Sequence, residues 1–102
     1  MRITVRKTKN VLEKMRGLIA ASEPEGILIQ TRFGIHTFGL RFPIDLAVID
    51  REDYVRTLRH EFKPNGIFLW SPKYDRILEL PKGTLKENKI KKGEKLELLI
   101  TG

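Results

Sequence analysis

Apolar and polar side chains alternate in short stretches along the chain, and this pattern predicts a β-rich fold. Ile3 and Val5 alternate with polar neighbours, which is the period of a strand with one face in water. Residues 44–49 read IDLAVI and are apolar on both faces except near the start, a pattern typical of a central strand. The polar turn at 50–53 leads into an apolar-rich segment at 54–58, so we expect a hairpin here.

Turn residues and capping signals place the remaining elements. We expect residues 26–31 and 34–38 to pair as another hairpin through the bend between them. Asn10 and Glu13 have the spacing of a capping box, which predicts a short helix over residues 11–19. Later turn and capping signals predict strands at 67–70, 76–80 and 95–100, and one helical turn at 85–89.

The order of these elements favours the α+β class. Strands outnumber helices by roughly seven to two, mostly with short connections, which predicts a small barrel-like, mainly antiparallel β-sheet with one or two short helices. The chain has 102 residues, and no linker, repeat or low-complexity tract divides it. We therefore expect residues 1–102 to form one domain around one hydrophobic core.

Cysteine is absent, which excludes disulfides, thiolate metal ligands and a cysteine nucleophile. The first residues read as an amphipathic strand and not as an apolar leader. No apolar run approaches the ~20 residues that a membrane span requires. We therefore expect a soluble cytoplasmic protein with no membrane partner.

Basic residues are concentrated toward the two ends of the chain. The net charge is +7: residues 1–20 carry six basic and one acidic side chain, residues 21–81 eight and nine, and residues 82–102 six and three. If the terminal strands pair, their basic residues create a positive field on one side that favours anionic partners. The alternative is a thermostable protein, because 32% charged residues with abundant Lys and Glu are typical of heat-adapted proteins.

Four ordered blocks of sequence resemble a known family. They are MRGL at 15–18 with the glycine and apolar strand that follow at 26–28, IHTFGLRFPID at 35–45, VID at 48–50, and ILELPKGT at 77–84. Together they resemble domain of unknown function family 192 (DUF192, also UPF0127) over about residues 11 to 98. HTF and RFPID look like the variant of archaeal-type members. The resemblance implies a compact, barrel-like α+β fold, and it supplies no activity.

Three polar residues, His36, Arg41 and Asp45, are interleaved with apolar and aromatic residues and are the best candidates for a site. A buried charge is costly unless it is paired, so these groups are either site residues or structural partners. Arg41 and Asp45 lie about 13 Å apart along a straight strand, so a direct ion pair needs a bend at Pro43. Arg16 is a second candidate cation for Asp45. Both a ligand-binding site and an Arg–Asp bridge that pins the sheet stay open.

Several other chemistries lack the residues that they require. The two histidines, His36 and His60, have no ligand partners at short spacing, so we expect no metal site. Ser22 and Ser71 lack the Gly-x-Ser-x-Gly setting of a hydrolase nucleophile, and no glycine-rich phosphate loop precedes a helix. We therefore expect no cofactor.

The residues leave three functions open. The first is a binding domain that holds a small anionic ligand, or a partner's carboxylate, in a polar cleft around His36, Arg41 and Asp45. The second is an enzyme in which Asp45 or His36 acts as a general base. The third is a weak nucleic-acid binder that uses the terminal basic residues. The sequence identifies neither the ligand, nor catalytic residues, nor the oligomeric state.

Aromatic residues close to basic ones are a further signal for nucleic acid. Trp70, Tyr74 and Phe62 lie near lysines and an arginine in the sequence, as on surfaces that stack unpaired bases. The alternative is that Trp70, together with Phe68, belongs to the hydrophobic core.

Overall fold

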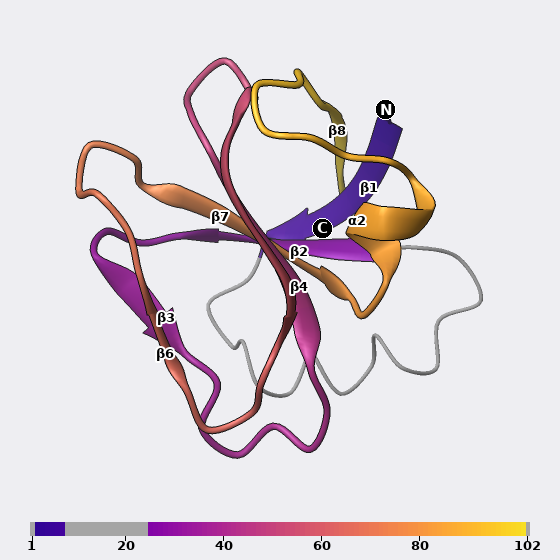
Figure 1. The fold of residues 1–102 in the computed structure, drawn as a ribbon. Coiled ribbons are helices and arrows are strands. Elements are labelled where there is room, and N and C mark those ends of the chain that lie inside the picture. Colours follow the sequence, from indigo (N-terminus) through magenta and orange to yellow (C-terminus); the bar gives the residue numbers. More distant parts are fainter. Residues whose placement is uncertain (1, 8–24, 102) are drawn as a thin grey trace.

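The computed structural model describes residues 2–7 and 25–101, which form two β-sheets and one short helix (Figure 1). The larger sheet has six strands in the order β5-β4-β7-β2-β1-β8, and the smaller sheet pairs β3 with β6. The strands are β1 (Arg2–Lys7), β2 (Glu25–Gln30), β3 (Gly34–His36), β4 (Ile44–Ile49), β5 (Val55–Phe62), β6 (Ile67–Leu69), β7 (Arg76–Pro81) and β8 (Glu97–Thr101), and the helix is α2 (Thr84–Glu87).

β4 lies inside the larger sheet and is buried along its whole length, as expected for a central strand. It pairs antiparallel with β5 and with β7, so the predicted hairpin through the turn at 50–53 is confirmed. Successive side chains of a strand point to opposite faces. Ala47 therefore joins one hydrophobic cluster, while Leu46 and Val48 join the other.

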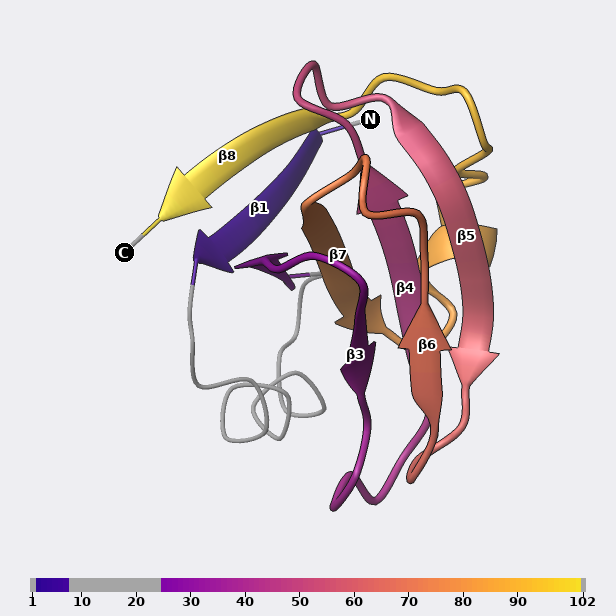
Figure 2. The same ribbon diagram turned by 90° about the vertical axis from the view of Figure 1, so that its left-hand side faces the viewer.

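A different set of side chains packs against each face of the larger sheet. On one face, the strands pack against Leu85 of α2 and against Ile90 and Leu96 from the segment that leads to β8. On the other face, the smaller sheet contributes Phe68 of β6 and Ile35 of β3. Figure 2 shows β3 and β6 lying in front of β4 and β7 on this side. The strands between these two layers therefore have no free face.

β2 does not form the expected hairpin with β3. It pairs with β1 and β7, whereas β3 pairs with β6. The physical reason is burial: Ile27, Leu28 and Ile29 are at most 6% exposed, and an isolated hairpin cannot cover both faces of a strand. Gly26 permits the close packing that results, because a Cβ there would lie 2.8 Å from Cδ2 of Leu80.

The two terminal strands lie side by side, which is the condition that the charge argument required. β1 pairs with β8 in parallel, and it also runs parallel to β2, while the other strand pairs are antiparallel. β5 and β8 form the edges of the larger sheet, so the sheet is not closed and is barrel-like only in a loose sense. The predicted mainly β, α+β fold is confirmed. No helix within the described residues is long and apolar enough to cross a membrane.

Candidate functional site

Asp45 on β4 is fully buried, and its carboxylate holds two backbone amides. Oδ1 accepts a hydrogen bond of 2.9 Å from the N–H of Glu61, and Oδ2 accepts one of 2.9 Å from the N–H of Leu85. Glu61 lies near the end of β5 with a φ of 48°, and Leu85 belongs to α2. Asp45 therefore fixes α2 and the end of β5 against the sheet.

The bridge between Arg41 and Asp45, one of the two alternatives that the sequence left open, is not formed. Arg41 is exposed and makes no ion pair within 4 Å to any residue that the structure describes. The oxygens of Asp45 instead accept hydrogen bonds from the backbone N–H groups of Glu61 on β5 and Leu85 on α2. Arg16 lies outside the described residues, and its expected contact with Asp45 stays a prediction.

His36 lies on β3, in the layer on the other side of the larger sheet from α2 (Figure 1). The His36 ring is exposed and stacks on Phe38, with ring centroids 4.8 Å apart and an interplanar angle of 22°. Its Nδ1 accepts a hydrogen bond of 3.3 Å from the N–H of Phe38. The structure therefore does not bring His36 and Asp45 together in one cleft.

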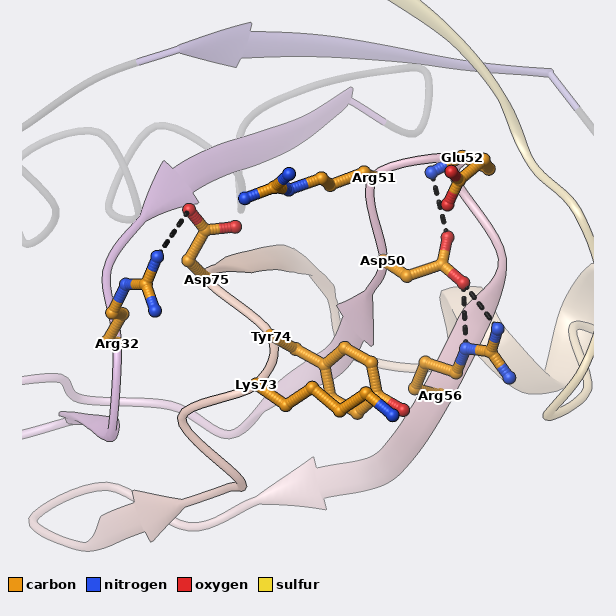
Figure 3. Close-up of a pocket in the computed structure, with 8 residues that line it drawn as sticks. All are labelled: Arg32, Asp50, Arg51, Glu52, Arg56, Lys73, Tyr74 and Asp75. Atoms are coloured by element: carbon orange, nitrogen blue, oxygen red, sulfur yellow. Dashed lines mark hydrogen bonds and ion pairs between the residues drawn. The ribbon is translucent and has the colours of Figure 1, made fainter.

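A polar pocket of about 330 Å³ opens where the β4–β5 turn meets the loop before β7 (Figure 3). Three segments that are distant in the sequence meet there, and the lining residues are Arg32, Asp50, Arg51, Glu52, Arg56, Lys73, Tyr74 and Asp75. Four of these side chains are cations and three are carboxylates, so the lining carries a net charge of +1. The predicted site residues His36, Arg41 and Asp45 are not part of this lining.

Asp50 organises the turn that forms one wall of the pocket. Its Oδ1 accepts hydrogen bonds from the N–H of Glu52 at 2.9 Å and from the N–H of Tyr54 at 3.0 Å. Its Oδ2 accepts one from Nε of Arg56 at 2.8 Å. Burial raises the pKa of Asp50, but these backbone and guanidinium hydrogen bonds outweigh burial and hold the pKa below its usual range. The Asp50–Arg56 pair is therefore ionised at neutral pH.

Arg51 and Lys73 are the pocket cations that are available to a ligand. Both side chains are exposed, and neither has a carboxylate within 4 Å among the residues described. Figure 3 shows Arg51 extending across the pocket toward Asp75. Nζ of Lys73 lies 5.9 Å from the centroid of the Tyr74 ring. Arg32, in contrast, contacts Asp75, with 4.0 Å between Nη2 and Oδ2.

Glu79 on β7 is a buried carboxyl that the sequence analysis missed. It is fully buried, and neither of its oxygens has a hydrogen-bond partner among the described residues. Its cross-strand neighbours are Ile27 of β2 and Leu46 of β4, both apolar. Burial raises the pKa of Glu79 from 4.5 to about 8. A single carboxylate within the apolar run ILEL was the sequence signal for it.

The pocket residues had weaker signals in the sequence. Charged residues in turns are common, so DRED at 50–53 and PKYD at 72–75 read as ordinary solvated loops. Within residues 2–7 and 25–101, no group of three or more His, Asp or Glu side chains is arranged to hold a metal ion. The chemistry that the pocket offers is therefore charge and an aromatic surface.

Two solved bacterial structures share this fold. One is a protein of unknown function from Novosphingobium aromaticivorans, which is 18% identical, has a TM-score of 0.64, and is matched over 90% of this chain and 71% of that chain. The other is a "putative transcription regulator" from Sinorhizobium meliloti. It is 18% identical, has a TM-score of 0.67, and is matched over 91% of this chain and 78% of that chain. At such identities the likeness concerns the fold, not the activity.

Sequence comparison assigns the chain to a family. No curated protein matches it. The family model of DUF192, described as "Uncharacterized ACR", matches residues 1–98, a range that contains all the blocks noted in the sequence. The chain belongs to the DUF192 family.

Proposed function

We propose that this domain binds a small organic anion in the pocket beside Tyr74. The observation that carries the proposal is that Arg51 and Lys73 line the pocket and have no ion-pair partner within 4 Å among the described residues. Cations gathered in a hollow raise the local concentration of anions. A guanidinium such as that of Arg51 also binds a carboxylate or a phosphate through two parallel hydrogen bonds.

The remaining lining residues define the shape of the ligand. A volume of about 330 Å³ is at the small end of ligand sites, which range from about 300 to 1,000 Å³. The Tyr74 ring supplies a flat apolar surface against which a planar group can stack. Asp50 and Arg56 hold one wall before any ligand arrives, so little ordering is needed on binding. The pocket therefore suits a carboxylate or phosphate attached to a small planar group.

The other functions expected from the sequence remain predictions, as does a cytoplasmic location. For acid–base catalysis, Asp45 has both oxygens occupied by backbone amides, whereas His36 is exposed. For nucleic-acid stacking, Trp70 is partly buried against the core and donates its indole N–H to the carbonyl of Tyr74 at 2.8 Å. We favour the pocket because its free cations and its ring lie together.

Isothermal titration with three probes tests the proposal. Phenyl phosphate supplies both an anion and a ring, inorganic phosphate supplies the anion, and phenol supplies the ring. We expect phenyl phosphate to bind more tightly than either of the other two. Arg51→Ala should weaken the binding of phenyl phosphate at least about tenfold, because a hydrogen bond to a charged group contributes about 1.5–3 kcal/mol.

Arg41→Ala is the matched control, since Arg41 is also an exposed arginine without an ion pair to the described residues but lies outside the pocket lining. It should leave the affinity for phenyl phosphate unchanged. Equal weakening by the two variants, or no binding of phenyl phosphate to the parent protein, would contradict the proposal.

A further inference from the structure

The outer face of the β3–β6 sheet exposes large apolar side chains. Ile67 and Leu69 of β6 are 61% and 69% exposed, and the flanking Phe33 and Phe38 are 64% and 46% exposed. We call Ile67 and Leu69, together with Phe33 and Phe38 just outside the two ends of β3, the ribbon face. A cluster of exposed large apolar side chains is uncommon on a soluble domain unless it contacts a partner.

Strand register explains why these side chains cannot turn inward. Ile35 pairs with Phe68, and both pack against the core under the ribbon. Because side chains alternate along a strand, Ile67 and Leu69 must point to the opposite, outer side. Leu69 lies over Gly34, where a Cβ would be 2.6 Å from Cδ2 of Leu69. The sequence therefore builds an apolar outer face as well as an apolar inner one.

The two sequence segments that form the ribbon and its flanks are basic, and the nearby Asp75 contacts one of their cations, Arg32. Residues 32–43 and 62–74, which form the ribbon and its flanks, contain four Lys or Arg side chains and His36, but no Asp or Glu. By contrast, residues 44–61 between them contain five carboxylates. The net positive charge of these two segments complements a partner that carries negative charge.

The cations lie at the two ends of the ribbon. At one end, Nη1 of Arg32 donates to the carbonyl of Pro72 at 3.2 Å, which places Arg32 beside the loop that contains the next lysine. At the other end, Oγ1 of Thr37 donates to the carbonyl of Lys63 at 2.8 Å, and the turn that starts at Thr37 leads to Arg41. Apolar side chains therefore occupy the middle of the face and cations its ends.

The backbone holds this face in a fixed shape. The N–H of Trp70 donates to the carbonyl of Phe33 at 3.0 Å, and the N–H of Thr37 donates to the carbonyl of Gly66 at 2.9 Å, so the pairing extends beyond both ends of β3. Phe33 has a φ of 76°, an unfavourable conformation for a bulky side chain, and yet its ring is exposed. Strain of this kind is commonly kept where it positions a side chain for function.

We propose that the ribbon face docks on the surface of an anionic lipid bilayer. Exposed apolar side chains enter the boundary between headgroups and acyl chains, and the surrounding cations contact lipid phosphates and carboxylates. The sequence analysis predicted no membrane partner, and the proposal departs from that prediction because this surface becomes visible only when the strands are paired. The apolar side chains Ile67 and Leu69 are not part of the proposed anion pocket, although two cations at one end of the ribbon, Arg32 and Lys73, also line that pocket.

Other occupants fit the ribbon face less well. A second copy of the chain would bring two sets of like charges together, which opposes association. Unpaired bases stack on aromatic rings, whereas the most exposed side chain of this face, Leu69, is aliphatic. A bilayer accepts aromatic and aliphatic side chains alike and needs no matching shape.

Vesicle co-sedimentation tests the proposal on the intact chain. We expect the protein to sediment with vesicles that contain about one-quarter phosphatidylserine and to remain in solution with pure phosphatidylcholine. Binding should weaken in about 0.5 M NaCl, because salt screens the cations. Ile67→Ser combined with Leu69→Ser should lower the partition coefficient at least about tenfold through lost apolar burial.

The matched control is Leu99→Ser with Ile100→Ser on β8, where the side chains are 43% and 58% exposed but lie away from the ribbon. It should leave vesicle binding within about twofold of the parent. All four positions are exposed, and thermal unfolding of each variant checks that the fold is kept.

Arg51→Ala should retain vesicle binding, and the ribbon variant should retain phenyl phosphate binding, so this inference and the proposed function can fail independently.

Three outcomes would overturn the docking proposal. The first is a parent protein that stays in solution with anionic vesicles, and the second is an equal loss of binding in the ribbon and β8 variants. The third is a parent dimer, seen by sedimentation equilibrium, that the ribbon variant abolishes, because the face would then bind a second copy of the chain.

Discussion

Asp45 and Glu79 are carboxylates buried on the adjacent strands β4 and β7, and their surroundings differ. Asp45 accepts two backbone N–H groups, whereas Glu79 has no hydrogen-bond partner among the described residues. The two backbone hydrogen bonds satisfy the acceptor oxygens of Asp45, whereas burial among apolar side chains raises the pKa of Glu79 to about 8. At the scale of single residues, the hydrogen bonds of Asp45 therefore hold elements together, while the burial of Glu79 makes the stability of the fold depend on pH.

Glu79→Gln should make the protein more stable in alkaline solution. The pKa of Glu79 is about 8 in the folded state against 4.5 for the free side chain, so ionising Glu79 favours unfolding. Its contribution to stability is fully present below pH 4.5 and is lost as the pH rises to about 8. Above that pH, the variant should gain on the order of a few kcal/mol in the free energy of unfolding.

Urea unfolding between pH 5 and pH 9 measures this gain. Glu87→Gln, at an exposed glutamate of α2, is the control and should keep the pH dependence of the parent. A Glu79→Gln variant with the same pH dependence as the parent would show that burial does not shift the titration of this group.

Asp45→Asn should destabilise the protein, because the amide nitrogen of asparagine cannot accept a hydrogen bond from a backbone N–H. One of the amides of Glu61 and Leu85 then loses its acceptor, at a cost of about 1–3 kcal/mol in the free energy of unfolding. Arg41→Ala should change the free energy of unfolding by less than about 0.5 kcal/mol, as expected for an exposed residue. Chemical unfolding of both variants decides between amide capping and an Arg41–Asp45 bridge, since a bridge would make the two losses similar.

At the scale of elements, the β3–β6 sheet depends on a close approach of two strands. Gly34 faces Leu69, and a Cβ at Gly34 would lie 2.6 Å from the carbonyl oxygen of Phe68. Gly34→Ala should therefore push the strands apart and lower the free energy of unfolding by about 1–3 kcal/mol. At Gly26 the nearest atom is the tip of the Leu80 side chain, at 2.8 Å, which can move aside.

Thermal unfolding of the two alanine variants compares these sites. We expect Gly34→Ala to lower the melting temperature more than Gly26→Ala, although Gly26 lies in a strand of the larger sheet. The reverse order would mean that the ribbon adapts to the extra methyl group more easily than β2 does.

Local sequence patterns predict elements better than they predict partners. The apolar run of β4 and the polar turn after it identify the β4–β5 hairpin, because both strands and the turn are contiguous in sequence. β2 looks equally strand-like, yet its partners β1 and β7 are distant in sequence, so a reading of neighbouring segments pairs it with β3. What decides the pairing is the burial of both faces of β2, a property of the assembled sheet.

At the scale of the whole molecule, the fold separates the predicted site residues and assembles a different set. His36 and Asp45 occupy different layers, while Arg51 and Lys73 meet at the pocket. Arg51 follows β4 and Lys73 precedes β7, and the antiparallel pairing of these strands brings the two segments together. The Asp50 turn can be predicted from its residues, but the meeting of two charged loops cannot, because it depends on strand order.

The most direct test of the account is amide chemical-shift mapping during titration with phenyl phosphate. If the anion binds where the free cations meet the Tyr74 ring, the signals that move should belong to residues 50–56 and 73–75, and those of β1 and β8 should stay in place. Shifts centred on residues 36–41, or spread evenly over the surface, would contradict the account.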